Sequence, residues 1–317
     1  MDVICLGILV ADVFLSPVDS LPKEGELKTV DSFLSSVGGC AANTAIDLRR
    51  LGRGVAVLGK VGSNMFGDFV IAELQRHGIE TSHVKRSHAL PTSSTVILNV
   101  RGEDRRYLHC IGANAEFSLA DVDLSVLAGS RVLYAGGYFA MPGFSPSDLA
   151  RLFREARKHS LTTVLDVVIP AGLSVSLDRL EEVLPYTDYF LPNQDEARTL
   201  TGLDDPADQA RCLARLNPAC TIAITRGALG SLTKCGTALI DTPVFQVNSI
   251  DESGAGDAFS AGFITGLLEN WPLDYILRFA SAVGASCTQA LGCHDGVFRF
   301  DQALSVLKAR PPFATPA

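Results

Sequence analysis

The sequence lacks long apolar runs, clusters of basic residues and paired cysteines. No run reaches the roughly 18 apolar residues of a membrane span, so none is expected. With a net charge of −8 over 317 residues and no Lys/Arg run, a nucleic-acid-binding surface is not expected either. None of its eight cysteines forms Cys-x-x-Cys, which indicates reduced thiols used as small apolar side chains. These features predict a protein of a reducing, cytoplasmic compartment.

Two common nucleotide-binding motifs are also missing. There is no G-x-x-x-x-G-K-[ST], which argues against a P-loop NTPase. No G-x-G-x-x-G follows the first predicted strand, so a dinucleotide-dependent oxidoreductase is not supported. The stretch TRGALG at 225–230 has only a Gly-x-x-Gly. A nucleotide site in this chain therefore needs another motif.

Apolar residues make up 47% of the sequence and charged residues 20%, which is enough apolar material for a large core. Strand-like apolar runs alternate with helical patterns, such as those at 40–52 and 66–78, along much of the chain. The runs lie at 3–10, 55–62, 131–138, 161–169, 187–193 and 220–227. This rhythm predicts an α/β fold with a mostly parallel sheet covered by helices on both faces. The chain from about 256 onward is expected to be mostly helical.

Two stretches, 25–36 and 92–110, break the rhythm because polar and apolar residues alternate in them. The second contains an Arg-Gly-Glu-Asp turn and predicts a hairpin. We expect a single domain over 1–317 with a small separate β-sheet, formed by inserted segments at about 12–36 and 91–111. Such a sheet would serve as a lid over the site, as a dimer surface, or as both. Its edges would allow a homodimer.

The glycine-rich stretch DESGAGDAF, residues 251–259, precedes a helical pattern. Gly254 and Gly256 permit close approach of another group to the backbone. A helix starting near Gly256 would present free N–H groups, which bind anions. Asp257 falls in the first turn of that helix. It is either a partner of the helix dipole or a carboxylate that accepts a proton from a hydroxyl attacking a phosphoryl group.

DESGAGDAF resembles the C-terminal signature of the ribokinase-like (PfkB) carbohydrate kinases, usually D-T-x-G-A-G-D-x-F. Four further segments resemble family elements in the same order, namely GGCAANTAIDLRRLG (38–52), KVGSNMFGDFVIAELQRHGI (60–79), GANAEF (112–117) and NQDEARTLTG (193–202). The resemblance implies the ribokinase-like three-layer fold. It also implies an ATP-dependent kinase that phosphorylates a hydroxyl of a sugar or sugar derivative. A nucleoside kinase and a non-catalytic binding protein on the same fold are the alternatives.

The same resemblance implies roles in the transfer step. Asp257 looks like the general base that deprotonates the acceptor hydroxyl. The amides of Gly254, Ala255 and Gly256 look like the anion hole for the γ-phosphate. The mechanism implied is in-line transfer with a lid that excludes water.

For the nucleotide and its magnesium ion, the resemblance points to five residues. Asn193 and Glu196 resemble the N-x-x-E pair that organises Mg²⁺, partly through water, although a helix N-cap with its capping box fits them equally well. Thr225 and Gly227 resemble residues that line the phosphates and ribose of ATP. Ser281 falls where the family often places a small polar residue near the adenosine.

For the acceptor, Asp12 resembles the acid at the end of the first strand that binds hydroxyl groups. Gly38, Gly39 and Asn43 resemble the sugar-contacting N-terminal signature, and Asn43 equally fits a helix cap. Tyr138 lies where relatives line the substrate pocket. It would either stack on a nucleoside base or belong to the core.

Two positions depart from the family pattern. Glu252 replaces the usual Thr and has no evident role, and Asn64 stands where many members have Asp. Relatives also bind a monovalent cation, which implies a K⁺ site at Asp251, Ser253 and a loop at about 286–296. The sequence of that loop, with LGCHDG, is not a close match to the family.

Overall fold

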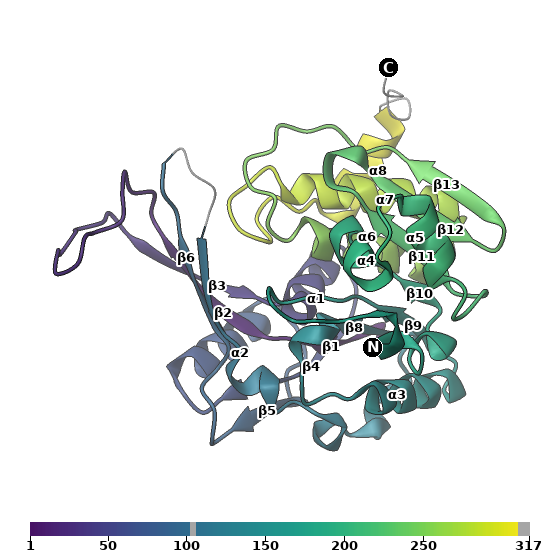
Figure 1. The fold of residues 1–317 in the computed structure, drawn as a ribbon, viewed down its shortest axis with the longest axis horizontal. Helices are drawn as coiled ribbons and strands as arrows, with labels where there is room; N and C mark the ends of the chain where they lie inside the picture. The colour runs from purple at the N-terminus through teal and green to yellow at the C-terminus, as the bar shows by residue number, and fades with distance from the viewer. Residues whose placement is uncertain (102–105, 310–317) are drawn as a thin grey trace.

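The computed structural model describes residues 1–101 and 106–309 (Figure 1). Within them nine strands form one sheet, in the order β13-β12-β11-β10-β9-β8-β1-β4-β5. The strands are β1 (Val3–Gly7), β4 (Val55–Gly62), β5 (Val84–Ser87), β8 (Val132–Gly136), β9 (Thr162–Leu165), β10 (Tyr189–Phe190), β11 (Thr221–Thr225), β12 (Ser231–Cys235) and β13 (Ala238–Thr242). All neighbours from β5 to β11 are parallel, and only β12 and β13 add antiparallel pairs. The predicted mostly parallel α/β sheet is confirmed.

Helices cover both faces of this sheet. They are α1 (Cys40–Arg50), α2 (Met65–Arg76), α3 (Pro146–Lys158), α4 (Gln194–Thr201), α5 (Pro206–Leu213), α6 (Ala255–Leu268), α7 (Leu273–Cys287) and α8 (Phe300–Ala309). One apolar cluster joins the sheet to α1, α2, α6, α7 and α8, and a second joins it to α3, α4 and α5. In β1, Val3 and Cys5 enter the first cluster, whereas Ile4 enters the second. This alternation explains the continuously apolar run, because a strand covered on both faces has no solvent side.

The apolar run 3–10, predicted as one strand, is divided between two sheets. β1 ends at Gly7, where a side chain would place its Cβ 2.1 Å from the carbonyl oxygen of Gly136. The chain then turns, and the Asn114 side chain fixes the turn: its Oδ1 accepts from the amide of Leu9 at 3.2 Å, and its Nδ2 donates to the Leu9 carbonyl at 3.1 Å. Asp12 therefore lies within the next strand, β2, and not at the end of the first.

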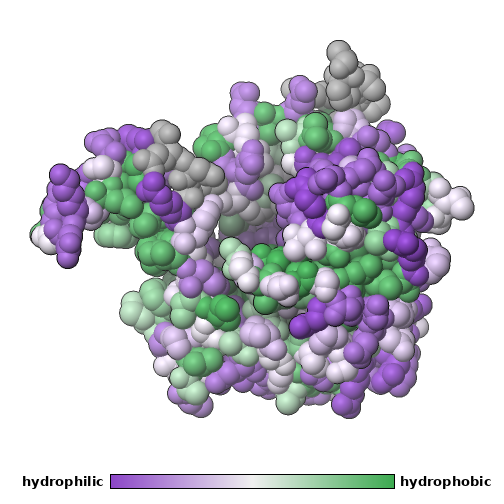
Figure 2. All heavy atoms as spheres, viewed as in Figure 1, coloured by the Kyte–Doolittle hydropathy of each residue, from purple (hydrophilic) through white to green (hydrophobic). Residues whose placement is uncertain are grey.

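The second sheet, called the lid below, has the strand order β3-β2-β6-β7. Its strands are β2 (Val10–Leu15), β3 (Phe33–Gly38), β6 (Ser94–Leu98) and β7 (Arg106–Cys110). β6 and β7 lie within the predicted segment 91–111, although residues 102–105, in the predicted hairpin turn, lie outside the described part of the chain. β2 and β3 overlap the predicted segment 12–36 but extend two residues beyond it at each end, and residues 25–32 form no strand. The lid projects from the main body as a separate lobe, with a notch between the two (Figures 1 and 2).

Strand register gives the lid one face with two zones. Asp12 pairs with Ser36 on β3 and with Thr95 on β6, which in turn pairs with His109. Side chains two residues further along a strand share a face. The four polar positions near the base are therefore followed on the same face by an apolar zone, made of Phe14, Leu34, Ile97 and Tyr107.

Among the described residues, no helix is both long enough and apolar enough to cross a bilayer.

Candidate active site

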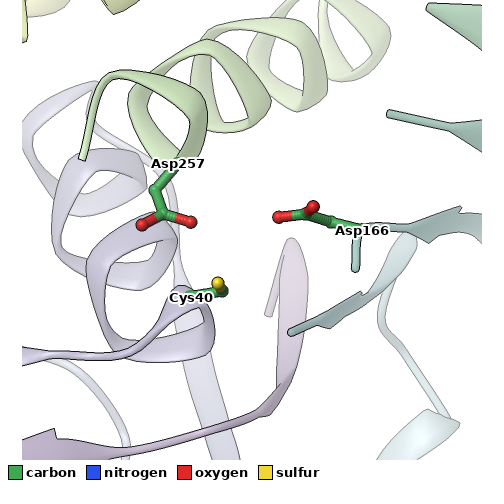
Figure 3. Close-up of side chains that lie close together, drawn as sticks. All are labelled: Cys40, Asp166 and Asp257. Atoms are coloured by element: carbon green, nitrogen blue, oxygen red, sulfur yellow. The ribbon is translucent and has the colours of Figure 1, made fainter. Parts of the chain in front are cut away.

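Three reactive side chains meet at the carboxyl edge of the parallel sheet (Figure 3). Cys40 is the first residue of α1, Asp166 directly follows β9, and Asp257 lies in the first turn of α6. Their sulfur and carboxylate oxygen atoms all lie within 4.8 Å of one another. Carboxyl ends of parallel strands and the helices that follow them converge at one edge, which is where open α/β sheets bind ligands.

The start of α6 is set by a glycine. Gly254 caps the helix in the left-handed conformation, with φ +76°, and a Cβ there would lie 2.7 Å from the Cβ of Cys293. Gly256 and Asp257 lie in the first turn, where a helix leaves its N–H groups without partners inside the helix. Such N–H groups, together with the helix dipole, favour an anion. These N–H groups are in keeping with the predicted anion hole, although the amide of Ala255 donates to the Glu252 carbonyl at 3.3 Å.

The carboxylate of Asp257 is held by a neighbouring helix. Asn43 Nδ2, on α1, donates to Asp257 Oδ2 at 2.8 Å, and the Thr44 hydroxyl lies 3.5 Å from the Asp257 carbonyl. Burial raises the pKa of Asp257, while the hydrogen bond from Asn43 opposes the rise. A raised pKa makes a carboxylate a better proton acceptor near neutral pH. Asn43, predicted to contact the acceptor, therefore also orients the candidate base.

This contact predicts the pH dependence of turnover. Asn43→Ala removes a donor that stabilises the Asp257 carboxylate, so the pKa of Asp257 should rise further. The base acts when deprotonated, so the acidic limb of the kcat/KM profile should move to higher pH. The expected shift is about one pH unit, because a hydrogen bond to a charged group is worth ~1.5–3 kcal/mol. Thr44→Val is the matched control and should leave the limb in place. An unshifted limb in Asn43→Ala would contradict the proposed contact.

Two further carboxylates surround Asp257. Asp166 is buried and accepts a hydrogen bond from the Tyr134 hydroxyl at 2.7 Å. Burial raises the pKa of Asp166 well above its usual range, and the carboxylates of Glu196 and Asp257 add to the rise. Burial likewise raises the pKa of Glu196 to about 7. No described lysine or arginine pairs with any of the three carboxylates. The pocket therefore favours a cation.

Asn193 and Glu196 form a complete capping box at the start of α4. The Asn193 side chain accepts from the Glu196 amide at 2.8 Å, and the Glu196 side chain accepts from the Asn193 amide at 2.8 Å. Asn193 also forms a bridge with Thr225 at the end of β11, so the two predicted nucleotide residues are neighbours. The capping-box interpretation is confirmed, and the cap still leaves Glu196 close enough to Asp166 and Asp257 to interact with them electrostatically.

Comparison with known proteins identifies the family. The model for the pfkB family carbohydrate kinases matches residues 1–297 of this chain.

The chain belongs to the pfkB family of carbohydrate kinases.

Individual relatives agree with this assignment. A ribokinase of Haemophilus influenzae is 28% identical, with 96% of this chain and 97% of that protein aligned. A structure of Arabidopsis thaliana ribokinase complexed with ribose and ATP has a TM-score of 0.83 at 23% identity, covering 98% of this chain and 99% of that one. A putative ribokinase II from E. coli in complex with ATP and Mg²⁺ has a TM-score of 0.79 at 19% identity and covers 98% and 99%. These structures confirm the ribokinase-like fold.

In this PfkB kinase one of the residues predicted to contact the acceptor, Gly38, lies against Asp12. A Cβ on Gly38 would lie 2.0 Å from Asp12 Oδ2, so only glycine permits this approach. Gly39, with φ +94°, would place a Cβ 2.4 Å from the carbonyl oxygen of Ile8. Burial raises the pKa of Asp12 to about 6. Tyr138 is only 1% exposed, and its ring packs 5.0 Å from the ring of Phe139.

The remaining residues predicted to bind the nucleotide, Gly227 and Ser281, differ in their surroundings. Gly227 follows β11 with φ +54°, and a Cβ added there would meet no atom within 4 Å, so its backbone is open to approach. Ser281 is buried, and its hydroxyl donates to the Pro243 carbonyl at 3.2 Å while accepting from the Phe245 amide at 3.1 Å. In this structure Ser281 secures the 243–245 segment to α7.

The predicted K⁺ residues frame the loop beside the anion hole. The Asp251 carboxylate accepts from the amides of Ser253 at 2.8 Å and Gly292 at 3.0 Å. His294, in the same loop, lies 3.4 Å from Asp47 Oδ1 on α1. Its other ring nitrogen lies 3.2 Å from the carbonyl oxygen of Val37 at the base of the lid, so the loop connects the body with the lid.

The sequence did not lead us to three residues of the site, namely Asp166, Cys40 and Tyr134. Only Asp166 had a feature in the sequence that could have pointed to it. Asp166 interrupts the apolar run 161–169, as Asp12 interrupts the first run. Cys40 and Tyr134 carry no such signal, because a thiol and a phenol are ordinary core side chains. Glu252, left without a role, is exposed.

Proposed function

We propose that this PfkB kinase transfers the γ-phosphoryl group of ATP to a hydroxyl of a sugar or sugar derivative. The observation that carries the proposal is the position of Asp257. It stands in the first turn of a helix, is oriented by Asn43, and has a pKa raised by burial. This arrangement supports a proton acceptor beside an anion site, which is what attack of an alcohol on a phosphoryl group requires.

The residues would divide the work as follows. Asp257 accepts the proton of the acceptor hydroxyl, and the amides at 254–256 stabilise the charge on the transferring group. Thr225 and Gly227 line the nucleotide. When bound, Mg²⁺ would neutralise phosphate charge; Asn193 and Glu196 would hold it, partly through water, and oxygen ligands suit this ion. A monovalent cation would bind at Asp251, Ser253 and the 286–296 loop.

The lid supports a polyhydroxyl acceptor over a nucleoside. Its polar base offers Asp12, Ser36, Thr95 and His109 on one face, by register. Tyr138, which would stack on a nucleoside base, is instead buried in the core. A thermal-shift screen with an ATP analogue should therefore show stabilisation by sugars, since a ligand that binds the folded state raises Tm. Stabilisation by nucleosides alone would favour the second candidate, and the absence of ADP formation with every acceptor tested would favour a non-catalytic binding protein.

Asp12 gives the acceptor proposal a direct test. Asp12→Ala should raise KM for the acceptor by about 10–100-fold, because hydrogen bonds to a charged group are worth ~1.5–3 kcal/mol. KM for ATP should stay unchanged. Asp19→Ala is the matched control, because Asp19 is exposed, lies outside the four lid strands and, among the described residues, pairs with Arg101 at 3.0 Å. Steady-state kinetics, with the ATP and acceptor concentrations varied in turn, measure both KM values. Equal increases in the two KM values would contradict the assignment of Asp12 to the acceptor site.

The free lid edge supports a homodimer as the assembly. β3 is an edge strand, and Phe33 and Leu34 on it are 66% and 60% exposed. Leu34→Asp should shift the protein from dimer to monomer mass in sedimentation, because an unpaired charge in an apolar contact is costly. Leu27→Asp, at a 92% exposed position outside the lid strands, should not. A dimer that survives Leu34→Asp would contradict assembly through this edge.

The proposed kinase activity also implies binding partners and a cellular location. We propose ATP and a sugar as partners, without nucleic acid or membrane. All eight cysteines are free, which supports a reducing, cytoplasmic location.

A further inference from the structure

A thiol stands at the centre of the candidate active site. Cys40 is 7% exposed, and its sulfur points toward the gap between the carboxylates of Asp166 and Asp257 (Figure 3). The three side chains come from three separate elements and present one sulfur and two carboxylate donors within 4.8 Å. Phosphoryl transfer with Mg²⁺ makes no use of sulfur, because that hard cation takes oxygen ligands.

Both carboxylates are oriented from outside the gap. Tyr134 donates to Asp166 Oδ2 at 2.7 Å, and Asn43 donates to Asp257 Oδ2 at 2.8 Å. Such outer hydrogen bonds are typical of carboxylates that ligate a metal. No described lysine or arginine neutralises this group by an ion pair. The grouped donors, the outer hydrogen bonds and the two carboxyl groups without a described lysine or arginine partner therefore point to a cation ligated by sulfur and oxygen.

We propose that Cys40, Asp166 and Asp257 bind a thiophilic divalent cation, represented by Zn²⁺, and that its binding blocks phosphoryl transfer. Zn²⁺ takes Cys sulfur at about 2.3 Å and carboxylate oxygen at about 2.0–2.2 Å, usually with four ligands. The three donor atoms already lie within 4.8 Å of one another, so they would have to move only a short way to bind one ion. Soft thiolate ligands select Zn²⁺ over Mg²⁺.

The binding step is a simple exchange. The Cys40 thiol, and either aspartate that carries a proton, releases it to solvent; the thiolate and one oxygen of each aspartate then bind the ion, and water fills the fourth position. No electron is transferred. An Asp257 oxygen bound to the ion cannot accept the acceptor proton, so catalysis stops while the ion is present.

The first test measures Zn²⁺ inhibition at buffered free Zn²⁺, saturating Mg²⁺-ATP and a phosphine reductant. The wild type should be inhibited. Cys40→Ala should need at least about tenfold more free Zn²⁺ for the same inhibition, since even an outer-shell partner is worth 10–100-fold in metal affinity. Cys110→Ala removes an exposed lid thiol and should behave as the wild type. Equal sensitivity of Cys40→Ala and the wild type would overturn the proposal.

The second test does not depend on turnover, so it separates this site from the proposed kinase function. Co²⁺ is added to the whole apo protein, and the near-ultraviolet thiolate-to-cobalt charge-transfer absorption is recorded. The band should appear in the wild type and in Cys110→Ala, and should vanish in Cys40→Ala. A Cys40→Ala protein of unchanged Tm that keeps the band would place the thiolate ligand elsewhere and overturn the site.

Discussion

Asp257→Asn is expected to fold normally and to lose roughly 10²–10⁴-fold in kcat, the range for removal of a general base. The amide keeps the shape of the carboxylate, and its oxygen can still accept from Asn43, so the packing of α1 against α6 should persist. What is lost is the ability to take up the proton of the acceptor hydroxyl. Coupled assays of ADP formation measure kcat, and Tm checks the fold.

The matched control addresses the simpler interpretation of Asp257 as a helix-dipole partner. Asp274 also lies in the first turn of a helix, α7, but it is exposed and lies 3.9 Å from Arg278. A dipole partner contributes about 0.3–1 kcal/mol to stability and nothing to turnover. Asp274→Asn should therefore leave kcat unchanged. Near-normal kcat in Asp257→Asn, as in this control, would return Asp257 to the dipole role.

The fold was predictable because its signals are local. Apolar runs covered on both faces predicted the parallel strands, and the alternating stretches predicted the lid. The first run shows the limit of this reasoning. Nothing within 3–10 reveals that the strand ends at Gly7, because the break depends on Asn114, which binds the Leu9 backbone across 105 residues of chain.

The candidate site was predictable only where residues belong to ordered motifs. Asp257 and Asn43 were assigned from two separate segments, and the structure brings them within hydrogen-bonding distance at 2.8 Å. Asp166 lies in none of the family segments, and Cys40 lies inside the segment 38–52 but had no role assigned to it; the importance of both arises from contact in space. Their perturbed pKa values also come from that contact, because burial and neighbouring carboxylates raise both.

Gly254→Ala is expected to lower kcat by roughly 10²–10³-fold, the usual loss when one preorganised amide donor is misplaced. Gly254 has φ +76°, which an alanine adopts only at a cost of order 1–3 kcal/mol. Its Cβ would also lie 2.8 Å from the Cα of Cys293, a backbone atom that cannot simply rotate away. The start of α6 must therefore shift, and Tm should fall together with kcat.

Gly256→Ala is the control that distinguishes loss of a backbone amide donor from loss of a glycine as such. Gly256 lies within α6, has no left-handed φ and has no atom within 4 Å of an added Cβ. Alanine there keeps the amide, and it favours the helix by about 1 kcal/mol over glycine, so Tm should hold or rise. With the amide kept in place, kcat should stay within about tenfold of the wild type. If Gly254→Ala instead kept full kcat despite a lower Tm, displacement of the amides would have cost nothing in the transition state. The amides at this helix start would then not hold the transferring phosphoryl group.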